Sequence, residues 1–156
     1  MTKEELYLKT IFCCIACDGN IATEEVDMVR DLCAKDRIFH NLDSEEYLNS
    51  WITEINEQGG AFLQTYLKEI NSVELNEQEQ LLLVSLAIKA IEADNSIEYA
   101  EVKFFKKIRS KLTISDEAIL AEHPDKEKFL LTDINITEIP QWDDSTHFSQ
   151  ISIQTN

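Results

Sequence analysis

Glycine and proline are scarce in this sequence, with three glycines and two prolines among 156 residues. Proteins made of strands and tight turns need both residues often, whereas both weaken the interior of a helix. The scarcity therefore disfavours a β-protein and favours long helices. With 44% hydrophobic residues, the chain is still apolar enough to bury a core, and its length suits one domain.

Long hydrophobic runs are also missing. The longest uninterrupted apolar run, residues 11–17, is far shorter than the roughly 20 residues that cross a bilayer. The N-terminus lacks the basic region and apolar stretch of a secretory signal peptide. We therefore expect a cytoplasmic protein with no direct membrane insertion.

Basic residues are outnumbered, with 14 Lys and Arg against 30 Asp and Glu, giving a formal net charge of −16. Nucleic-acid binding needs clustered basic side chains for phosphate contacts, so the sequence argues against it. Strong acidity suits solubility, divalent cations or a basic protein partner. Basic residues do cluster at one place, and we interpret this cluster as a solvated helix face rather than a docking patch. Its members are Lys103, Lys106, Lys107, Arg109 and Lys111.

Known enzyme motifs are absent as well. Three glycines, at positions 19, 59 and 60, cannot form a dinucleotide fingerprint or a phosphate-binding loop. The sequence has no G-x-S-x-G and no H-E-x-x-H. Among 30 acidic residues, carboxylate pairs are expected by chance and do not indicate acid–base catalysis. We predict a protein that is not an enzyme.

The four cysteines, Cys13, Cys14, Cys17 and Cys33, include one Cys-x-x-Cys pair. A reactive pair lies at a helix N-terminus, where the helix dipole favours thiolate. Here the pair is expected at a helix C-terminus beside Asp18, which disfavours thiolate. The histidines are scattered and lack metal-ligand spacing. We interpret the cysteines as buried, reduced core residues rather than a redox or zinc site.

An acidic nine-residue stretch occurs twice, at residues 18–26 and 94–102, in the pattern D-x-x-I-x-x-x-E-V. An apolar segment precedes each copy, and an amphipathic segment follows each copy. A repeated supersecondary unit has this signature. The sequence predicts two copies of a buried helix, a tight acidic turn and an amphipathic helix.

Capping residues and apolar periodicity predict about seven helices. We place them at residues 3–17, 22–35, 44–57, 61–70, 77–93 and 98–111, with a short seventh that begins near residue 115. The first and fifth are apolar on every side, so they should be buried side by side at the centre. The predicted fold is all-α, with an internal two-fold repeat over residues 1–122 and a C-terminal extension, residues 123–156, packed on it. Residues 133–156 carry four acids and no Lys or Arg, and we expect an extended tail with Trp142 and Phe148 docked.

The acidic turns allow two interpretations. Six residues in them offer the hard oxygen ligands that Ca²⁺ or Mg²⁺ prefers: Asp18, Asn20, Glu25, Asp94, Ser96 and Glu101. The spacing is not that of an EF-hand loop. Alternatively, the carboxylates cap the following helices, because Ala22 and Glu98 stand at the N-cap positions and are poor caps. We favour capping and keep a divalent cation as the alternative.

The doubled turn on a helical frame resembles the TerB tellurite-resistance family, which is related to the N-terminal domain of membrane-anchored DnaJ-like co-chaperones. The family motif, approximately A-D-G-x-I-x-x-x-E, is matched by residues 17–25 and 93–101, within a resemblance that covers about residues 3–122. Asn95 replaces the usual glycine, and Thr23 and Tyr99 stand where the family often has proline. The resemblance implies an intracellular helical domain linked to stress resistance, with roles in metal association and protein scaffolding.

Three functions are consistent with these features. The first is a non-enzymatic, TerB-like module of cytoplasmic stress resistance that binds protein partners, with divalent cations as an added ligand. The second is an acidic immunity-type inhibitor that neutralises a basic toxin or nuclease by charge complementarity. The third, which the sequence favours least, is a metal-dependent enzyme.

Overall fold

The computed structural model describes residues 1–19, 21–40, 42–93, 99–125, 148 and 151. Over these residues the chain forms helices and no strands, which confirms the all-α prediction. The elements are α1 (Lys3–Ala16), α2 (Thr23–Lys35), η1 (Arg37–Phe39), α3 (Ser44–Gln58), α4 (Gly60–Glu69), η2 (Ile70–Ser72), α5 (Glu77–Ile91), α6 (Tyr99–Ser110) and α7 (Asp116–Glu122). None of the helices in this part of the chain is long and apolar enough to cross a bilayer.

The helix starts follow from local capping. Asn76 and Glu79 form a complete capping box at α5, with the two reciprocal hydrogen bonds at 2.8 and 2.9 Å. At α1 the sequence Thr2-Lys3-Glu4-Glu5 also predicts a capping box, but only half of it forms. Thr2 Oγ1 accepts from the Glu5 amide at 3.1 Å, but the Glu5 carboxylate instead accepts from the Tyr47 hydroxyl of α3. A long-range contact has therefore displaced the local one.

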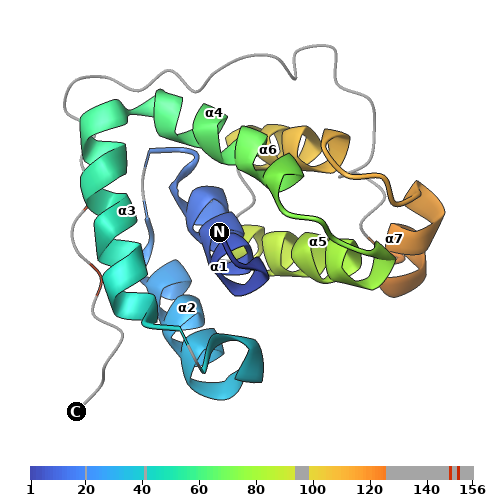
Figure 1. Cartoon of the computed structure of the whole chain (residues 1–156), viewed down its shortest axis with the longest axis horizontal. Coiled ribbons are helices and arrows are strands. Elements are labelled where there is room, and N and C mark those ends of the chain that lie inside the picture. The colour runs from blue at the N-terminus through green and yellow to red at the C-terminus, as the bar shows by residue number, and fades with distance from the viewer. Residues whose placement is uncertain (20, 41, 94–98, 126–147, 149–150, 152–156) are drawn as a thin grey trace.

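Helix α1 occupies the centre of the molecule, with α3, α4, α5 and α6 around it (Figure 1). Every residue from Leu6 to Ala16 is buried, which confirms the prediction for the apolar run and extends the burial to the residues before it. Its most extensive neighbour is α5, also as predicted. The two helices differ, however, because α5 is not buried all round: Lys89 is exposed, and Leu81 and Ser85 are half-buried.

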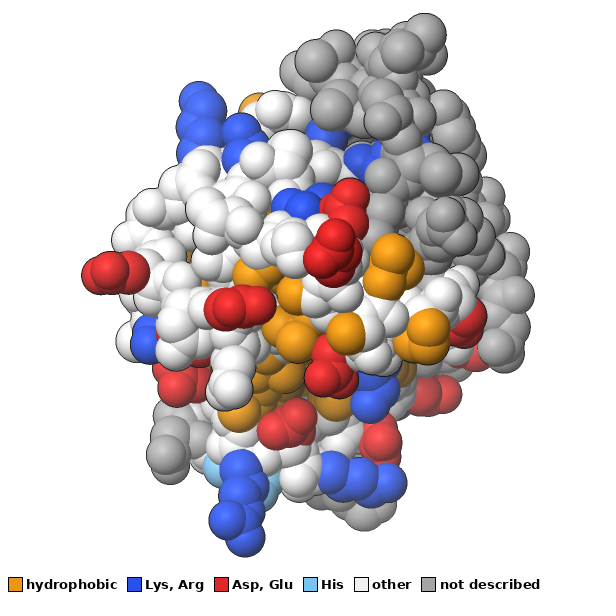
Figure 2. All heavy atoms as spheres, turned by 90° about the vertical axis from the view of Figure 1, so that its right-hand side faces the viewer, with side chains coloured by type: hydrophobic (Ala, Val, Ile, Leu, Met, Phe, Trp, Pro, Cys, Tyr) orange, Lys and Arg blue, Asp and Glu red, His pale blue; other side chains and the backbone are white. Residues whose placement is uncertain are grey.

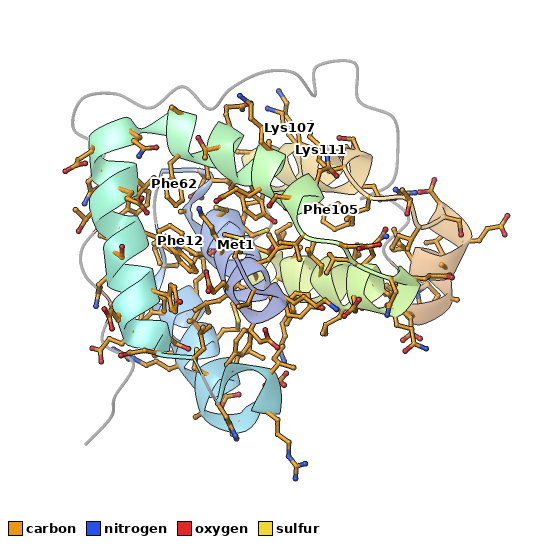
Figure 3. All side chains as sticks on the ribbon, in the orientation of Figure 1. Met1, Phe12, Phe62, Phe105, Lys107 and Lys111 are labelled. Carbon is orange, nitrogen blue, oxygen red and sulfur yellow. The ribbon has the colours of Figure 1, made fainter. Side chains whose placement is uncertain are left out.

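Aromatic rings fill the space between α1, α3 and α4. Phe12 and Phe62 meet edge to face with ring centroids 5.9 Å apart, and both point into this space in Figure 3. The buried Lys9 of α1 places its ammonium 4.8 Å from the Phe62 ring centroid and 2.5 Å from a carboxylate oxygen of Glu69. The one lysine in the middle of α1 is therefore neutralised and covered rather than left as a buried charge.

Buried polar side chains join segments that are distant in sequence. Gln80, near the start of α5, accepts from the amides of Thr113 and Ile114 and donates to the carbonyl of Leu75. These bonds hold the loop before α7 against α5. Thr10 and Tyr66 are fully buried, and their hydroxyl oxygens lie 2.6 Å apart between α1 and α4.

Most of the C-terminal extension, including Trp142, lies outside the described residues, which cover positions 123–125, 148 and 151 of it. Phe148 and Ile151 are each 4% exposed and belong to the hydrophobic core. The docking predicted for Phe148 is therefore found, while the domain boundary near residue 122 and the internal repeat stay predictions.

Candidate functional site

The first acidic turn begins where α1 ends. Gly19 has a φ of 87°, and its amide donates to the carbonyl of Ala16 at 2.9 Å. A positive φ at the end of a helix is costly for residues with a β-carbon, which explains the glycine. The turn delivers the chain to Ala22, the N-cap residue of α2.

Glu25 caps α2. It is 4% exposed, and its Oε1 accepts a hydrogen bond from the Ala22 amide at 2.6 Å. Alanine has no side-chain acceptor, so the carboxylate from the third helical position takes over part of the N-cap's role. Its negative charge also lies at the positive end of the helix dipole. This is the arrangement that the capping interpretation predicts.

Glu101 occupies the corresponding place in the second half of the chain. It is the third residue of α6, as Glu25 is of α2, and it is 2% exposed. Residues 94–98, which form the second acidic turn, lie outside the described part of the structure. The two glutamates therefore share their position in the helix and their burial.

The fold brings both carboxylates towards the same part of α1. The pKa of the Cys14 thiol is raised well above its usual range, first by burial and then by the negative charges of Glu101 and Glu25. Both glutamates must lie within electrostatic range of one thiol for this to occur. The sequence could not say whether the two copies of the motif converge. In the structure Glu25 and Glu101, which hold the same position in the two copies, both lie within electrostatic range of the C-terminal half of α1.

The cysteines of α1 are unreactive in this environment. Cys13, Cys14 and Cys17 are 0% exposed, and burial raises the pKa of each thiol. The nearby carboxylates raise the pKa of Cys14 and Cys17 further. A protonated thiol is a poor nucleophile and a poor metal ligand. The prediction of buried core cysteines is confirmed for these three, whereas Cys33 is half-buried.

The proposed metal ligands are only partly described. Asp18 is exposed, Glu25 and Glu101 are buried, and Asn20, Asp94 and Ser96 lie outside the described residues. Within the described ranges, no three His, Cys, Asp or Glu side chains converge as a metal-binding group. The Glu25 carboxylate already binds the start of α2. The divalent-cation site therefore stays a prediction.

The basic residues around α6 form only in part the solvated face that the sequence suggested: Lys111 is exposed, but the others are partly or fully buried. Lys107 is 7% exposed, so it is buried. Arg109 binds Asp116, at the start of α7, through two hydrogen bonds of 2.8 and 3.1 Å. Figure 3 shows Lys107 and Lys111 at the side of the molecule that α6 forms. Tertiary packing buries Lys107 and pairs Arg109 with Asp116, and local periodicity in the sequence could not reveal either contact.

Sequence reasoning also missed a serine–histidine pair. Ser85 Oγ lies 2.8 Å from His123 Nε2, and it donates to the carbonyl of Leu81 at 2.9 Å. The tautomer of His123 sets which of the two side chains donates in this hydrogen bond. The two residues are 38 positions apart, and no motif links them.

The surface at the α7 end has a mixed character. Figure 2 shows hydrophobic side chains in the middle of this face, with both acidic and basic side chains around them. At the junction of η1 and α3, a hollow of about 490 Å³ is lined by Cys33, Phe39, His40, Leu42, Asp43, Ser44 and Glu45.

Comparisons with known proteins give no assignment. No protein-family model, no curated protein and no solved structure matches this chain.

Proposed function

We propose that the protein is a non-enzymatic, TerB-like helical module of cytoplasmic, tellurite-type stress resistance that acts by binding protein partners. The observation that carries this proposal is the placement of Glu25 and Glu101, which are buried at the same position of two helices and lie around the thiol of Cys14. These two glutamates of the repeated motif are buried among the helices, where Glu25 caps the start of α2. The buried thiols, whose pKa values are raised, favour binding over catalysis.

The stress-resistance part is tested by growth. Expression of the wild-type chain in a tellurite-sensitive bacterium should raise the tellurite concentration that permits growth. The variant Glu25→Gln/Glu101→Gln should protect less, while Glu57→Gln/Glu74→Gln, which changes two exposed acids, should protect like the wild type. No protection by a folded wild-type chain would overturn this part of the proposal.

Divalent cations are the added ligand in this proposal, bound by Asp18 and Asp94 with their neighbours in each turn. The measurement is thermal unfolding with Ca²⁺, Mg²⁺ or Zn²⁺ at physiological salt, because net charge alone lets many cations stabilise weakly. A selective rise in melting temperature that Asp18→Asn/Asp94→Asn abolishes would support the site. Glu57→Gln/Glu74→Gln is the charge-matched control. Equal shifts with all three cations would remove cations from the proposal.

An acidic immunity-type protein is the second candidate. The net charge of −16 favours a basic partner. If a basic nuclease toxin is encoded beside this gene, co-expression of the chain should restore growth of cells that make the toxin. Binding should also weaken steeply with salt. Failure of rescue would exclude this candidate.

A further inference from the structure

Two asparagines of α3 bind the backbone of the C-terminal segment. Asn56 Oδ1 accepts from the Phe148 amide at 2.8 Å, and Asn56 Nδ2 donates to the Phe148 carbonyl at 3.0 Å. Asn49 makes the same pair of bonds with Ile151, at 2.8 and 2.9 Å. Figure 1 shows the described pieces of this segment, in red, beside α3.

This geometry recognises a peptide backbone. An asparagine side chain carries one carbonyl oxygen and one NH₂ group, which match the N–H and C=O of a single residue. Each asparagine therefore replaces the neighbouring strand that would satisfy the same two groups in a sheet. On the side of the C-terminal segment, the four bonds involve main-chain atoms only, so they select for backbone conformation rather than for side-chain type.

The spacing of the two asparagines suits an extended peptide. Seven residues of α-helix rise about 10.5 Å, and three residues of extended chain span about 10 Å. Asn56 meets Phe148 and Asn49 meets Ile151, so the bound residues run opposite to α3. A helical ligand would rise only about 4.5 Å over three residues and could not reach both asparagines.

Side-chain burial adds selectivity. Phe148 and Ile151 are each 4% exposed and are part of the hydrophobic core. An aromatic residue followed three positions later by a branched aliphatic residue therefore supplies two apolar anchors. The asparagine side chains of α3 bind the main chain of the peptide at the same two residues.

We propose that Asn49, Asn56 and the apolar seats of Phe148 and Ile151 form a peptide-binding site, here called the α3 peptide site, which the chain's own C-terminal segment occupies in cis. Its ligand in trans is an extended segment of a partner protein with an aromatic residue and a branched aliphatic residue three positions apart. The proposal rests on the protein-binding part of the proposed function and names its surface.

A partner fits this site better than a second copy does. Residues 126–147 tether the chain's own segment, and such a tether gives an effective concentration on the order of millimolar. The identical segment of a second copy, at micromolar concentration, competes poorly against it. A partner displaces the segment when its own peptide binds more tightly or when further contacts assist it.

The test uses the full chain with Phe148→Asp/Ile151→Asp, which removes both apolar anchors and leaves the asparagines intact. The probe is a fluorescein-labelled synthetic peptide with the native sequence of residues 144–156, followed by fluorescence anisotropy. We expect the peptide to bind this variant at least tenfold more tightly than the wild type, whose site is occupied. Adding Asn49→Ala/Asn56→Ala should weaken binding at least tenfold, whereas adding Thr53→Ala, an exposed residue between them, should not.

Equal binding to the wild type and the anchor variant would overturn the proposal, as would binding that survives loss of both asparagines. If the variants fail to fold, a second measurement on the wild type still tests the proposal. It follows the hydrogen exchange of the Phe148 and Ile151 amides. Their protection should fall when millimolar unlabelled peptide is added, and unchanged protection would overturn the proposal.

Two further outcomes keep this proposal separate from the others. A concentration-dependent dimer that Phe148→Asp/Ile151→Asp abolishes would assign the site to a second copy and overturn the choice of a partner. If the wild type protects against tellurite but the peptide fails to bind, the α3 peptide site fails alone. If the peptide binds and protection is absent, the stress-resistance role fails alone.

Discussion

Glu24 and Glu25 are adjacent in the first turn of α2, yet their surroundings differ. Glu24 is exposed, whereas Glu25 is buried and binds the Ala22 amide. In sequence, the two residues are both acids near a helix start, and only the repeated position of Glu25 distinguishes it. Their contrast allows a matched test of the capping role.

We expect Glu25→Gln to lower the free energy of unfolding at pH 7 by about 1 kcal/mol, because a charged capping group is lost from the start of a helix. Glu24→Gln should cost less than about 0.5 kcal/mol, since its charge is exposed to solvent and screened. Urea unfolding followed by circular dichroism measures both. Equal costs for the two variants would contradict the assignment of Glu25 as the cap.

The four thiols should differ in reactivity. Cys13, Cys14 and Cys17 are enclosed, and burial raises the pKa of each thiol. Burial also raises the pKa of Cys33, but this thiol is only half-buried and is the accessible one of the four. An aromatic disulfide reagent at pH 8 should therefore modify one thiol in the native protein and four in guanidinium, because reaction needs an accessible thiolate. Cys33→Ser should remove the native reaction. Fast modification of two or more thiols in the native Cys33→Ser variant would show that the α1 cysteines are reactive.

Between elements, Gly59 forms the corner that joins α3 to α4. This residue has φ 61° and ψ −139°, and α4 begins at the next residue. A β-carbon at Gly59 would meet no other atom within 4 Å, so space is available and only the backbone conformation requires glycine.

Gly59→Ala should therefore destabilise the fold by about 1–3 kcal/mol through backbone strain alone. Gly60→Ala is the matched control, because Gly60 starts a helix and is not among the positive-φ glycines. The control should be neutral or should stabilise by up to about 1 kcal/mol. Thermal unfolding of both variants measures the difference, and an unchanged melting temperature for Gly59→Ala would refute the strain argument.

For the molecule as a whole, the buried thiols make stability depend on alkaline pH. Unfolded cysteine has a pKa of about 8.5, and burial in the folded state raises the pKa of Cys13, Cys14 and Cys17. Above pH 8.5 the unfolded chain releases protons that the folded chain keeps. Stability is therefore complete below this pH and falls as the pH rises.

Each such thiol should contribute a slope of about 1.4 kcal/mol per pH unit well above pH 8.5. We expect the free energy of unfolding, measured in urea with a reductant present, to fall steadily from pH 8.5 to pH 10. In Cys14→Ala the fall should be shallower by about the slope of one thiol. An identical pH dependence in the variant and the wild type would contradict a protonated, buried Cys14. Above this range Tyr7 also contributes, because burial and the charges of Glu79 and Glu4 raise its pKa to about 12.

The sequence by itself determined the helices, because their signals are local. Capping residues such as Asn76 and Ser115, the apolar run of α1 and the few glycines all act within a few residues along the chain. They placed the helix ends within about two residues. The same local reasoning identified Glu25 as a cap and the α1 cysteines as core residues.

Only the tertiary structure decided which distant residues meet. The approach of Glu25 and Glu101 to Cys14, the burial of Lys107 and the exposure of Lys89 depend on how whole helices pack. The pairing of Asn49 with Ile151 joins residues 102 positions apart. An asparagine on a helix surface has no local pattern that marks it as a peptide ligand, because its partner is defined by packing alone. The candidate peptide site was therefore invisible in the sequence, although the helix that carries it was not.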